Sequence, residues 1–94
     1  MAGLVVALAS VVSAAGPPLA EAEKLYSYTD YEGSLKLLQA LKDKTVEVYE
    51  LIGRNYYMMG DYKKATDFLE KASAGRPEDS DYMLWLGRAY GRRA

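Results

Sequence analysis

The chain has 94 residues, half of them apolar, and its 12 basic and 13 acidic side chains leave a net charge of −1. A chain of this length has room for one small domain, and the near-neutral charge argues against a nucleic-acid-binding protein. It contains no cysteine and no histidine, which removes disulfides, thiolate metal sites and the commonest general base. Packing alone must therefore hold the fold, and we expect no metal and no cofactor.

The first predicted element is an uncharged apolar segment that covers residues 1–18. Leu4 to Ala15 is a run of Leu, Val, Ala and Ser, as long as the apolar part of a signal peptide and too short to span a bilayer. Small side chains at Ser13 and Ala15, or Val12 and Ala14, suit a signal peptidase, and the Gly-Pro-Pro of residues 16–18 is expected to break any helix after them. We therefore predict export, to the periplasm or by secretion, with no membrane insertion of the mature domain. The alternative is a cytoplasmic protein whose first residues are disordered or form a buried strand or helix of a larger protein.

The rest of the chain has the apolar spacing of amphipathic helices, with large side chains three and four residues apart. In the last of four breaks, Gly75 is expected to end a helix in the left-handed conformation, and Pro77 to prevent its continuation. Asp79 or Ser80 is then expected to cap the next helix. The pattern predicts four or five helices of about ten to fifteen residues. The breaks begin at Tyr28, Lys42, Met59 and Gly75.

Self-similarity along the chain indicates how these helices are organised. Residues 52–56 (Ile-Gly-Arg-Asn-Tyr) align with residues 86–90 (Leu-Gly-Arg-Ala-Tyr). Residues 29–38 align with residues 60–69, at a spacing that is shorter by three. A period of about 34 residues with helix-turn-helix units, as in the first of these alignments, is typical of the tetratricopeptide repeat.

The middle unit resembles a tetratricopeptide repeat at ten positions, which carry that family's aromatic, small, turn and proline residues. They are Tyr49, Ile52, Gly53, Tyr56, Gly60, Tyr62, Ala65, Leu69, Ala72 and Pro77. The resemblance, to a bacterial type of exported repeat protein, implies an all-α fold of antiparallel helix-turn-helix repeats stacked as a short right-handed α-solenoid. It divides residues 19–94 into a degenerate unit (19–44), a full unit (45–78) and a half unit (79–94).

The repeat positions also predict which small and aromatic side chains pack between helices. Gly53 and Gly87 are expected where the two helices of a unit cross closest, with Ala65 opposite Gly53. The tyrosines expected to pack inside the units are Tyr31, Tyr49, Tyr56, Tyr62 and Tyr90. Those expected to stay free for recognition are Tyr26, Tyr28, Tyr57 and Tyr82.

By the same resemblance, function lies in a concave groove lined by the first helix of each unit, where a peptide or partner protein would bind. Arg54 and Arg88 repeat one position and are expected side by side, next to a second repeated position that holds tyrosine. Such a guanidinium pair suits an extended peptide with a carboxylate and an apolar side chain. As exposed charges, both arginines are expected to add little to stability. The predicted partner-binding residues are Tyr26, Glu50, Arg54, Tyr57, Met58, Leu84, Arg88 and Arg92.

Two alternatives to this interpretation remain open, and a third, catalysis, is not expected. The arginines could only solvate the face, or pair within a helix as Glu50 and Arg54 would. Catalysis is not expected, because the carboxylate pairs 21/23 and 47/50 have no nucleophile, oxyanion donor or cofactor loop beside them. Finally, the chain could be an assembly piece of a longer solenoid that self-associates through its C-terminal helix. That helix is apolar on more than one side, through Tyr82, Met83, Trp85, Leu86 and Tyr90.

Overall fold

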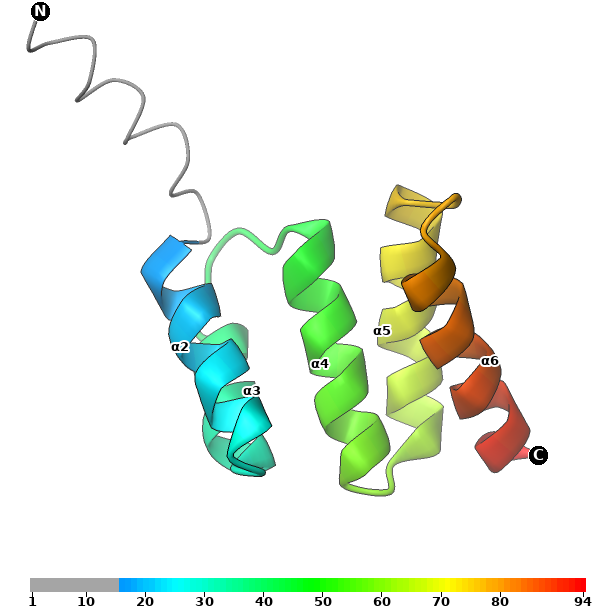
Figure 1. Ribbon diagram of the computed structural model, residues 1–94, viewed down its shortest axis with the longest axis horizontal. Coiled ribbons are helices and arrows are strands. Elements are labelled where there is room, and N and C mark those ends of the chain that lie inside the picture. The colour runs from blue at the N-terminus through cyan, green and yellow to red at the C-terminus, as the bar shows by residue number, and fades with distance from the viewer. Residues whose placement is uncertain (1–15) are drawn as a thin grey trace, which may run out of the picture.

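The structure, a computed structural model, describes residues 16–94, so all but the last three residues of the predicted apolar segment (1–18) lie outside the described part. Within residues 16–94 the chain forms five helices and no strand (Figure 1). They are α2 (Gly16–Ser27), α3 (Tyr31–Gln39), α4 (Val46–Met58), α5 (Tyr62–Gly75) and α6 (Ser80–Arg93). The helices and the four breaks between them confirm the predicted all-α fold.

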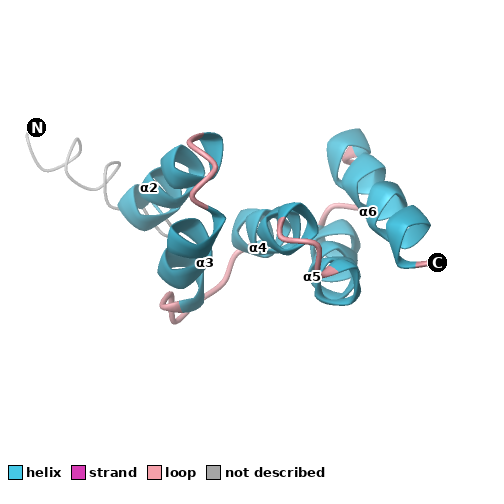
Figure 2. Ribbon diagram, turned by 90° about the horizontal axis from the view of Figure 1, so that it is seen from below, coloured by secondary structure: helices cyan, strands magenta, loops and turns pink. Residues whose placement is uncertain are grey.

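Each helix packs against the next one along the chain, so that α2 pairs with α3 and α4 pairs with α5. Helix α6 packs against α5, and no further helix follows it in the described residues. Helix α4 also touches both α2 and α6. Figure 2 shows α2 and α6 displaced to the same side of α4, so these three helices form a curved row with α3 and α5 behind it. This is the predicted stack of helical hairpins.

The two hairpins turn in the same way. In the α4–α5 turn Gly60 has a φ of 86°, and the amide of Asp61 donates to the carbonyl of Tyr56 at 2.9 Å. In the α2–α3 turn Thr29 has a φ of 64°, and Asp30 makes the equivalent bond, also at 2.9 Å. A left-handed residue followed by such a bond is the Schellman ending of a helix. The two segments aligned at the shorter spacing, residues 29–38 and 60–69, therefore begin with the same backbone turn.

Side-chain caps start the helices after these turns. The carboxylates of Asp30 and Asp61 accept hydrogen bonds from the amide three residues further on, at 2.9 and 3.2 Å. Thr45 caps α4 and Asp79 caps α6 in the same manner. Each cap satisfies an amide that has no partner within the helix. The prediction that residue 79 or 80 caps the last helix is confirmed for Asp79.

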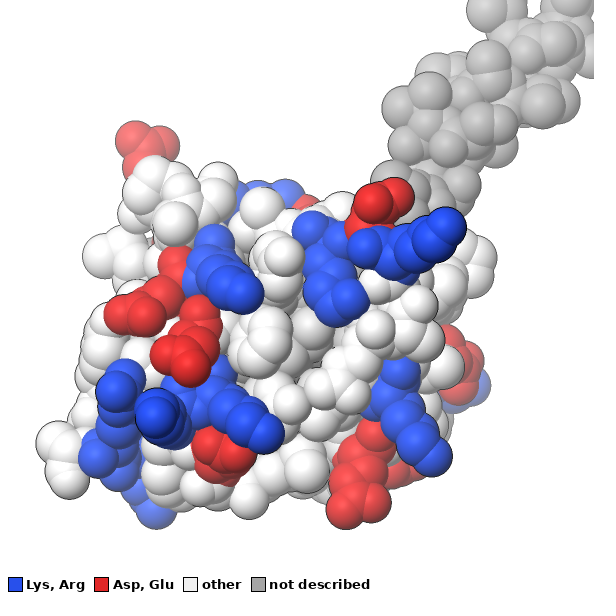
Figure 3. Space-filling view, turned by 180° about the vertical axis from the view of Figure 1, so that it is seen from behind, with Lys and Arg blue, Asp and Glu red and all other residues white. Residues whose placement is uncertain are grey.

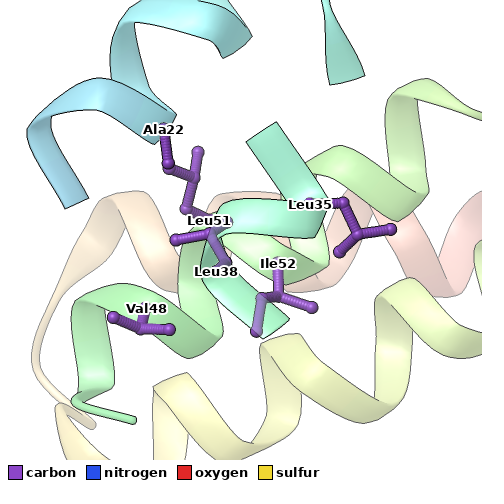
Figure 4. Packing of buried hydrophobic residues seen from close by; sticks show 6 residues of the cluster. All are labelled: Ala22, Leu35, Leu38, Val48, Leu51 and Ile52. Atoms are coloured by element: carbon purple, nitrogen blue, oxygen red, sulfur yellow. The ribbon is translucent and has the colours of Figure 1, made fainter. Parts of the chain in front are cut away.

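Two clusters of buried apolar side chains hold the stack together. The first joins the α2–α3 hairpin to α4 (Figure 4) and consists of Ala22, Leu35, Leu38, Val48, Leu51 and Ile52. The second attaches α6 to α5 and consists of Ala65, Leu69 and Ala89, with Tyr56, Tyr57, Trp85 and Leu86 packed against it. Burial of these side chains is the main favourable contribution to the fold.

A buried polar contact also joins the first hairpin to α4. The Ser34 hydroxyl donates to the carbonyl of Ala22 at 2.8 Å, and Asn55 Nδ2 donates to Ser34 Oγ at 2.9 Å. The same Asn55 nitrogen reaches the carbonyl of Leu51 at 3.1 Å. Ser34 and Asn55 are both fully buried. Because a buried polar group is costly without a partner, these bonds favour one register of the hairpin on α4.

Gly53 lies at the close approach of α4 and α5, as predicted, but Ala65 is not its nearest neighbour. A Cβ placed on Gly53 would lie 2.5 Å from Cγ of Leu69 and 3.2 Å from its backbone nitrogen. Leu69 is one turn further along α5 than Ala65, because the helices cross one turn beyond the predicted point. Ala65 is fully buried, and it packs in the cluster between α5 and α6.

Two other glycines differ from their predicted roles. A Cβ on Gly87 would meet nothing within 4 Å, because no helix of residues 16–94 covers that side of α6. Gly75 is the last residue of α5 and is not left-handed. Its Cβ would lie 2.7 Å from Cγ2 of Val46, so it is small because the end of α5 meets the start of α4. The helix ends at Arg76, immediately before Pro77.

The Gly-Pro-Pro at residues 16–18 forms the first turn of α2, and the predicted break between it and the preceding apolar run lies outside the described residues. The first amides of a helix have no acceptor within the helix, so Pro17 and Pro18 lose no hydrogen bond there. The helical stack therefore begins at Gly16, ahead of the predicted boundary at Leu19.

The opposite side of the molecule from the curved row carries mixed charge. In Figure 3, which shows this side, Lys and Arg are interspersed with Asp and Glu. Helix α5 contributes exposed side chains of both signs to the surface, namely Lys63, Lys64, Asp67, Glu70 and Lys71. A surface of this kind is typical of a solvated face.

Candidate functional site

The eight predicted binding residues all belong to the helices of the curved row. Helix α2 carries Tyr26, and α4 and α6 carry the others. Tyr26 and Tyr57 are half-buried, whereas Arg88 and Arg92 are exposed. Side chains from all three helices meet near the middle of the row, through contacts of arginine with aromatic rings.

These contacts form what we call the aromatic–arginine ladder, which consists of Tyr26, Arg54, Trp85 and Arg88. The guanidinium carbon of Arg54 lies 4.7 Å from the ring centroid of Tyr26 and 5.3 Å from that of Trp85. The guanidinium carbon of Arg88 lies 5.0 Å from the Trp85 ring. Arginine is attracted electrostatically to the face of an aromatic ring at such distances. The ladder thus links α2, α4 and α6 across the row.

Arg54 is also paired with an acid on its own helix. Its Nε lies 3.4 Å from Glu50 Oε2, one turn earlier, and only 28% of the Arg54 side chain is exposed. Glu50 is 8% exposed. Burial raises the pKa of Glu50, and the positive charge of Arg54 opposes this rise. Arg54 therefore supplies the opposite charge beside a carboxylate that is largely shielded from water.

This geometry changes the sequence-based view of the two arginines. The alternative in which Glu50 and Arg54 pair within a helix is confirmed. Arg54 is not a freely exposed charge, so the exposure on which the prediction of a small stability contribution depended does not hold for this residue. Arg54 and Arg88 both contact the Trp85 ring, and that ring was not among the predicted site residues. Arg88 is exposed and forms no ion pair with the other residues of 16–94.

Tyr57 is held by two further rings. It contacts Trp85 edge to face, with centroids 5.4 Å apart and an angle of 84° between the ring planes. Its contact with Tyr62 has a centroid distance of 5.4 Å and an angle of 66°. Tyr26 and Tyr31 form the equivalent pair in the first hairpin, at 5.5 Å and 64°. Burial raises the pKa of Tyr26.

The other predicted residues lie outside the ladder. Met58 is 43% and Leu84 51% exposed, so both are accessible. The guanidinium carbon of Arg92 lies 5.0 Å from the ring of Tyr62, at the start of α5. The structure therefore brings Arg54, Tyr57 and Arg88 onto Trp85, with Tyr26 and Glu50 on Arg54. It leaves the other three at the margin.

The division of the tyrosines into packed and free ones was partly wrong. Tyr82, expected to be free, is only 7% exposed, because it lies on the side of α6 that faces the rest of the protein. Burial raises its pKa. Tyr90, expected to pack, is 44% exposed, because the helix that would cover it is absent from residues 16–94. Its hydroxyl donates to Glu70, and this bond raises the pKa of Tyr90. Tyr28 is 68% exposed, as expected.

Trp85 was missed as a site residue, although the sequence contains a signal for it. Trp85 occupies the position in α6 that Leu51 holds in α4, and Leu51 is a core residue that is 2% exposed. Trp85 is half-buried, packs against the second core cluster and contacts Arg54 and Tyr57 of the row.

The two acids of α4 that could have formed a catalytic pair point to different partners. Glu47 pairs with Arg76, at the start of the loop after α5, whereas Glu50 pairs with Arg54. The position of Glu47 at the start of α4, where its own backbone amide and the Thr45 hydroxyl donate to it, lowers its pKa, and Arg76 lowers it further. No group of three acidic side chains in residues 16–94 could hold a metal ion. Open surface depressions lie near the turns, for example one lined by Thr29–Glu32 and Met59.

Comparison with known proteins leaves the site to be interpreted from its own geometry. No protein-family model matches the chain, and no curated protein sequence shows significant similarity to it. Among residues 16–94, none of the helices has both the length and the apolar character needed to cross a membrane.

Proposed function

We propose that residues 16–94 are a non-catalytic protein-interaction module of the tetratricopeptide-repeat type, which binds a peptide or a partner protein along the curved row of α2, α4 and α6. The observation that carries this proposal is the aromatic–arginine ladder. It places Arg88, a cation without an ion pair among the described residues, beside the Trp85 ring, which in turn contacts Tyr57. Rigid aromatic side chains beside an arginine are typical of the centre of a binding surface.

The charges of the ladder determine which group we expect to bind there. Arg54 is neutralised by Glu50, so the positive charge available to a ligand belongs to Arg88. An acidic side chain or a C-terminal carboxylate would form a charge-assisted hydrogen bond with it. The rings beside it suit an apolar or aromatic side chain of the same peptide. We therefore expect a ligand with an acidic group one or two residues from a large apolar side chain.

A display selection with peptides of random sequence tests this proposal. A nine-residue peptide library is selected against the full chain, and dissociation constants of enriched peptides are measured by fluorescence anisotropy. Enriched peptides should share an acidic group next to an apolar one. Arg88→Ala should weaken their binding at least about fivefold, which corresponds to ~1 kcal/mol.

Lys71→Ala is the matched control. Lys71 also rests on aromatic rings, with its Nζ 5.3 Å from the Tyr49 centroid and 5.1 Å from that of Phe68, but it lies on α5. This variant loses the same charge and should bind as the parent does. The proposal fails if Arg88→Ala and Lys71→Ala have the same effect, or if no acidic group is enriched.

We further propose that the protein is exported and that its first residues are a signal peptide. Cleavage after Ala15 would leave the first residue of α2, Gly16, as the new N-terminus, and all five described helices would remain. Mass spectrometry of the protein recovered from the periplasm or medium should then give a chain that begins at residue 15 or 16. An intact Met1 in that fraction would contradict the cleavage.

A further inference from the structure

Glu50 is a carboxylate that is almost completely enclosed and yet accepts no hydrogen bond within residues 16–94. The residue is 8% exposed. Its contact with Arg54 Nε, at 3.4 Å, is an ion pair without the geometry of a hydrogen bond, because this nitrogen has no hydrogen-bond partner among the described residues. A buried carboxylate without a donor is costly. The 11% of the Glu50 side chain that remains accessible is therefore a place where a donor from another molecule is favoured.

Carboxylates from the two neighbouring helices of the row act on Glu50 and make its surroundings negative. Together with burial they raise its pKa, which only a cation lowers. One cation, Arg54, opposes them, because Arg76 is already paired with Glu47. The acidic side of the row, as we call this group, consists of Glu23 of α2, Glu50 of α4, and Asp79 and Asp81 of α6.

Two members of this group have their charge free for a ligand. Glu23 and Asp81 are exposed, and neither forms an ion pair within the described part of the chain. Asp79 is occupied as the cap of α6, since its carboxylate accepts hydrogen bonds from the amides of Asp81 and Tyr82. Glu50 thus lies between an exposed acid of α2 and an exposed acid of α6.

We propose that the acidic side of the row binds a lysine or arginine side chain of the same peptide whose acidic group binds Arg88. This inference rests on the proposed function and adds a second charge to its ligand. An ammonium or guanidinium group would donate the hydrogen bond that Glu50 lacks, and the neighbouring carboxylates would attract its charge. The row then has two oppositely charged parts, which together fix the direction in which the peptide lies.

The spacing of the carboxylates favours a side-chain cation over a metal ion. A metal ion needs several oxygen ligands at about 2.0–2.6 Å, and no three acidic side chains of residues 16–94 lie close enough together to hold one. An ammonium or guanidinium group needs one good acceptor, and charges further away still stabilise it. Glu50 supplies the acceptor, and Glu23 and Asp81 supply the surrounding charge.

The geometry also sets the spacing of the two ligand charges. Arg54 and Arg88 contact the same Trp85 ring, so they lie at one level of the row. Glu50 precedes Arg54 by four residues, which is about 6 Å along α4. With neighbouring helices about 10 Å apart, Glu50 and Arg88 are separated by about 10–12 Å. An extended peptide covers this distance in three or four residues, at about 3.3 Å each.

The peptides selected against the full chain test this inference. Enriched peptides should carry Lys or Arg three or four positions from the acidic residue. Norleucine or citrulline at that position keeps the length of the side chain without its charge, and it should weaken binding at least about fivefold in fluorescence anisotropy.

A double-mutant cycle assigns this loss to Glu50. Glu50→Gln should weaken binding of the basic peptide at least about fivefold, and this loss should be absent with the uncharged peptide. Glu32→Gln is the matched control, because it makes the same change at an exposed acid on α3, outside the row. This variant should bind both peptides as the parent does.

The outcomes separate the cation site from the proposed function. Enriched peptides with acidic and apolar groups but no basic residue would overturn the cation site alone, as would equal effects of Glu50→Gln on both peptides. Glu50 would then be only hydrated. Basic peptides that couple to Glu50 but not to Arg88 would support the cation site and contradict the proposed function. A library that yields no binding peptide would overturn both.

A measurement on the parent chain gives an answer even if Glu50→Gln does not fold. Carbon-13 NMR of the Glu50 side-chain carboxyl follows its titration with and without bound peptide. The basic peptide should lower the pKa of Glu50, because a nearby cation favours the charged form. The norleucine or citrulline peptide should not lower it. Equal pKa changes with the two peptides would overturn the cation site.

Discussion

Helices α4 and α6 carry the same repeat signature, yet the residues of this signature are more exposed in α6 than in α4. In α4, Gly53 is buried against Leu69 of α5, and Ile52 is buried in the first core cluster. Leu86 is only half-buried and Gly87 is open, because α6 has a neighbour on one side only among the described helices. A repeat signature therefore indicates residues that can be buried, and they are buried where a following helix packs against them. The open side of α6 at Gly87 is the result.

The largest expected effect separates the two glycines of this signature. Gly53→Leu introduces a side chain whose Cβ would already lie 2.5 Å from Leu69, with the backbone of α5 behind it. We expect a loss of about 3 kcal/mol in the free energy of unfolding, because the helices must move apart. Gly87→Leu enters open space and should stabilise the isolated chain slightly, since leucine is the better helix former.

Urea unfolding followed by circular dichroism, at protein concentrations near 5 µM, measures both variants. The low concentration keeps any self-association of the chain out of the measurement. Equal effects at the two positions would mean that α4 and α6 are packed alike.

Replacement of the two arginines of the signature should also have unequal effects on stability, with the larger loss again in α4. Arg54→Ala leaves Glu50 buried without its cation and removes the contacts with Tyr26 and Trp85, so we expect a loss of about 2 kcal/mol in unfolding free energy. Arg88→Ala should cost less than about 0.5 kcal/mol, because Arg88 is exposed and has no ion pair within residues 16–94. Chemical denaturation compares the two variants.

The double variant Glu50→Gln/Arg54→Ala identifies the cause. Without a buried carboxylate, it should be more stable than Arg54→Ala alone. If the double variant is as unstable as the single one, packing of the Arg54 side chain accounts for the loss and the ion pair does not.

The C-terminal end of α2 can be compared with the C-terminal end of α4. Thr29 adopts a φ of 64° where α4 has Gly60, and a threonine in this region costs about 1 kcal/mol or more. Thr29→Gly should therefore raise the free energy of unfolding by about 0.5–1 kcal/mol after the entropy of glycine in the unfolded chain is included. Gly60→Ala should lower it by a similar amount. Thermal melts test both, and a destabilised Thr29→Gly would show that the threonine side chain makes a contact that compensates for its backbone.

Most of the fold could be predicted from local signals in the sequence. The breaks between the helices and the cap at residue 79 depend on residues close in the chain, and these predictions were confirmed. Predictions that depended on the exact crossing of two helices were less accurate. Gly53 was expected against Ala65 and lies against Leu69, because a shift of one helical turn leaves the pattern of apolar residues unchanged.

The candidate site was predictable only in part. The repeat positions placed Tyr26, Arg54 and Arg88 on one row of helices, but they could not show that Trp85 joins them. Nor could they show that Glu50 is buried, since burial of that position depends on the size of side chains from neighbouring helices. The errors at Tyr82 and Tyr90 have the same origin, because the predictions assumed a covering helix for α6 that residues 16–94 do not contain.

The smallest expected effect is a pH dependence that α4 has and α6 lacks, since Leu84 occupies in α6 the position of Glu50. Burial raises the pKa of Glu50 above its ordinary value of 4.5. The folded protein therefore holds this proton at pH values where the unfolded chain has lost it. The stability contributed by the proton is fully present below about pH 4.5 and is lost as the pH rises through the folded pKa.

Glu50→Gln removes this titration, so the unfolding free energy of Glu50→Gln minus that of the parent should increase between pH 4 and pH 7. Glu47→Gln is the internal contrast. The pKa of Glu47 is lowered, so its contribution is present above about pH 4.5 and is lost as the pH falls. The unfolding free energy of Glu47→Gln minus that of the parent should consequently increase as the pH falls. Urea unfolding at half-unit pH intervals measures both slopes. Because each variant is compared with the same parent, all other titrating groups cancel, and slopes of the same sign would contradict the assignment of Glu50 as the buried acid of α4.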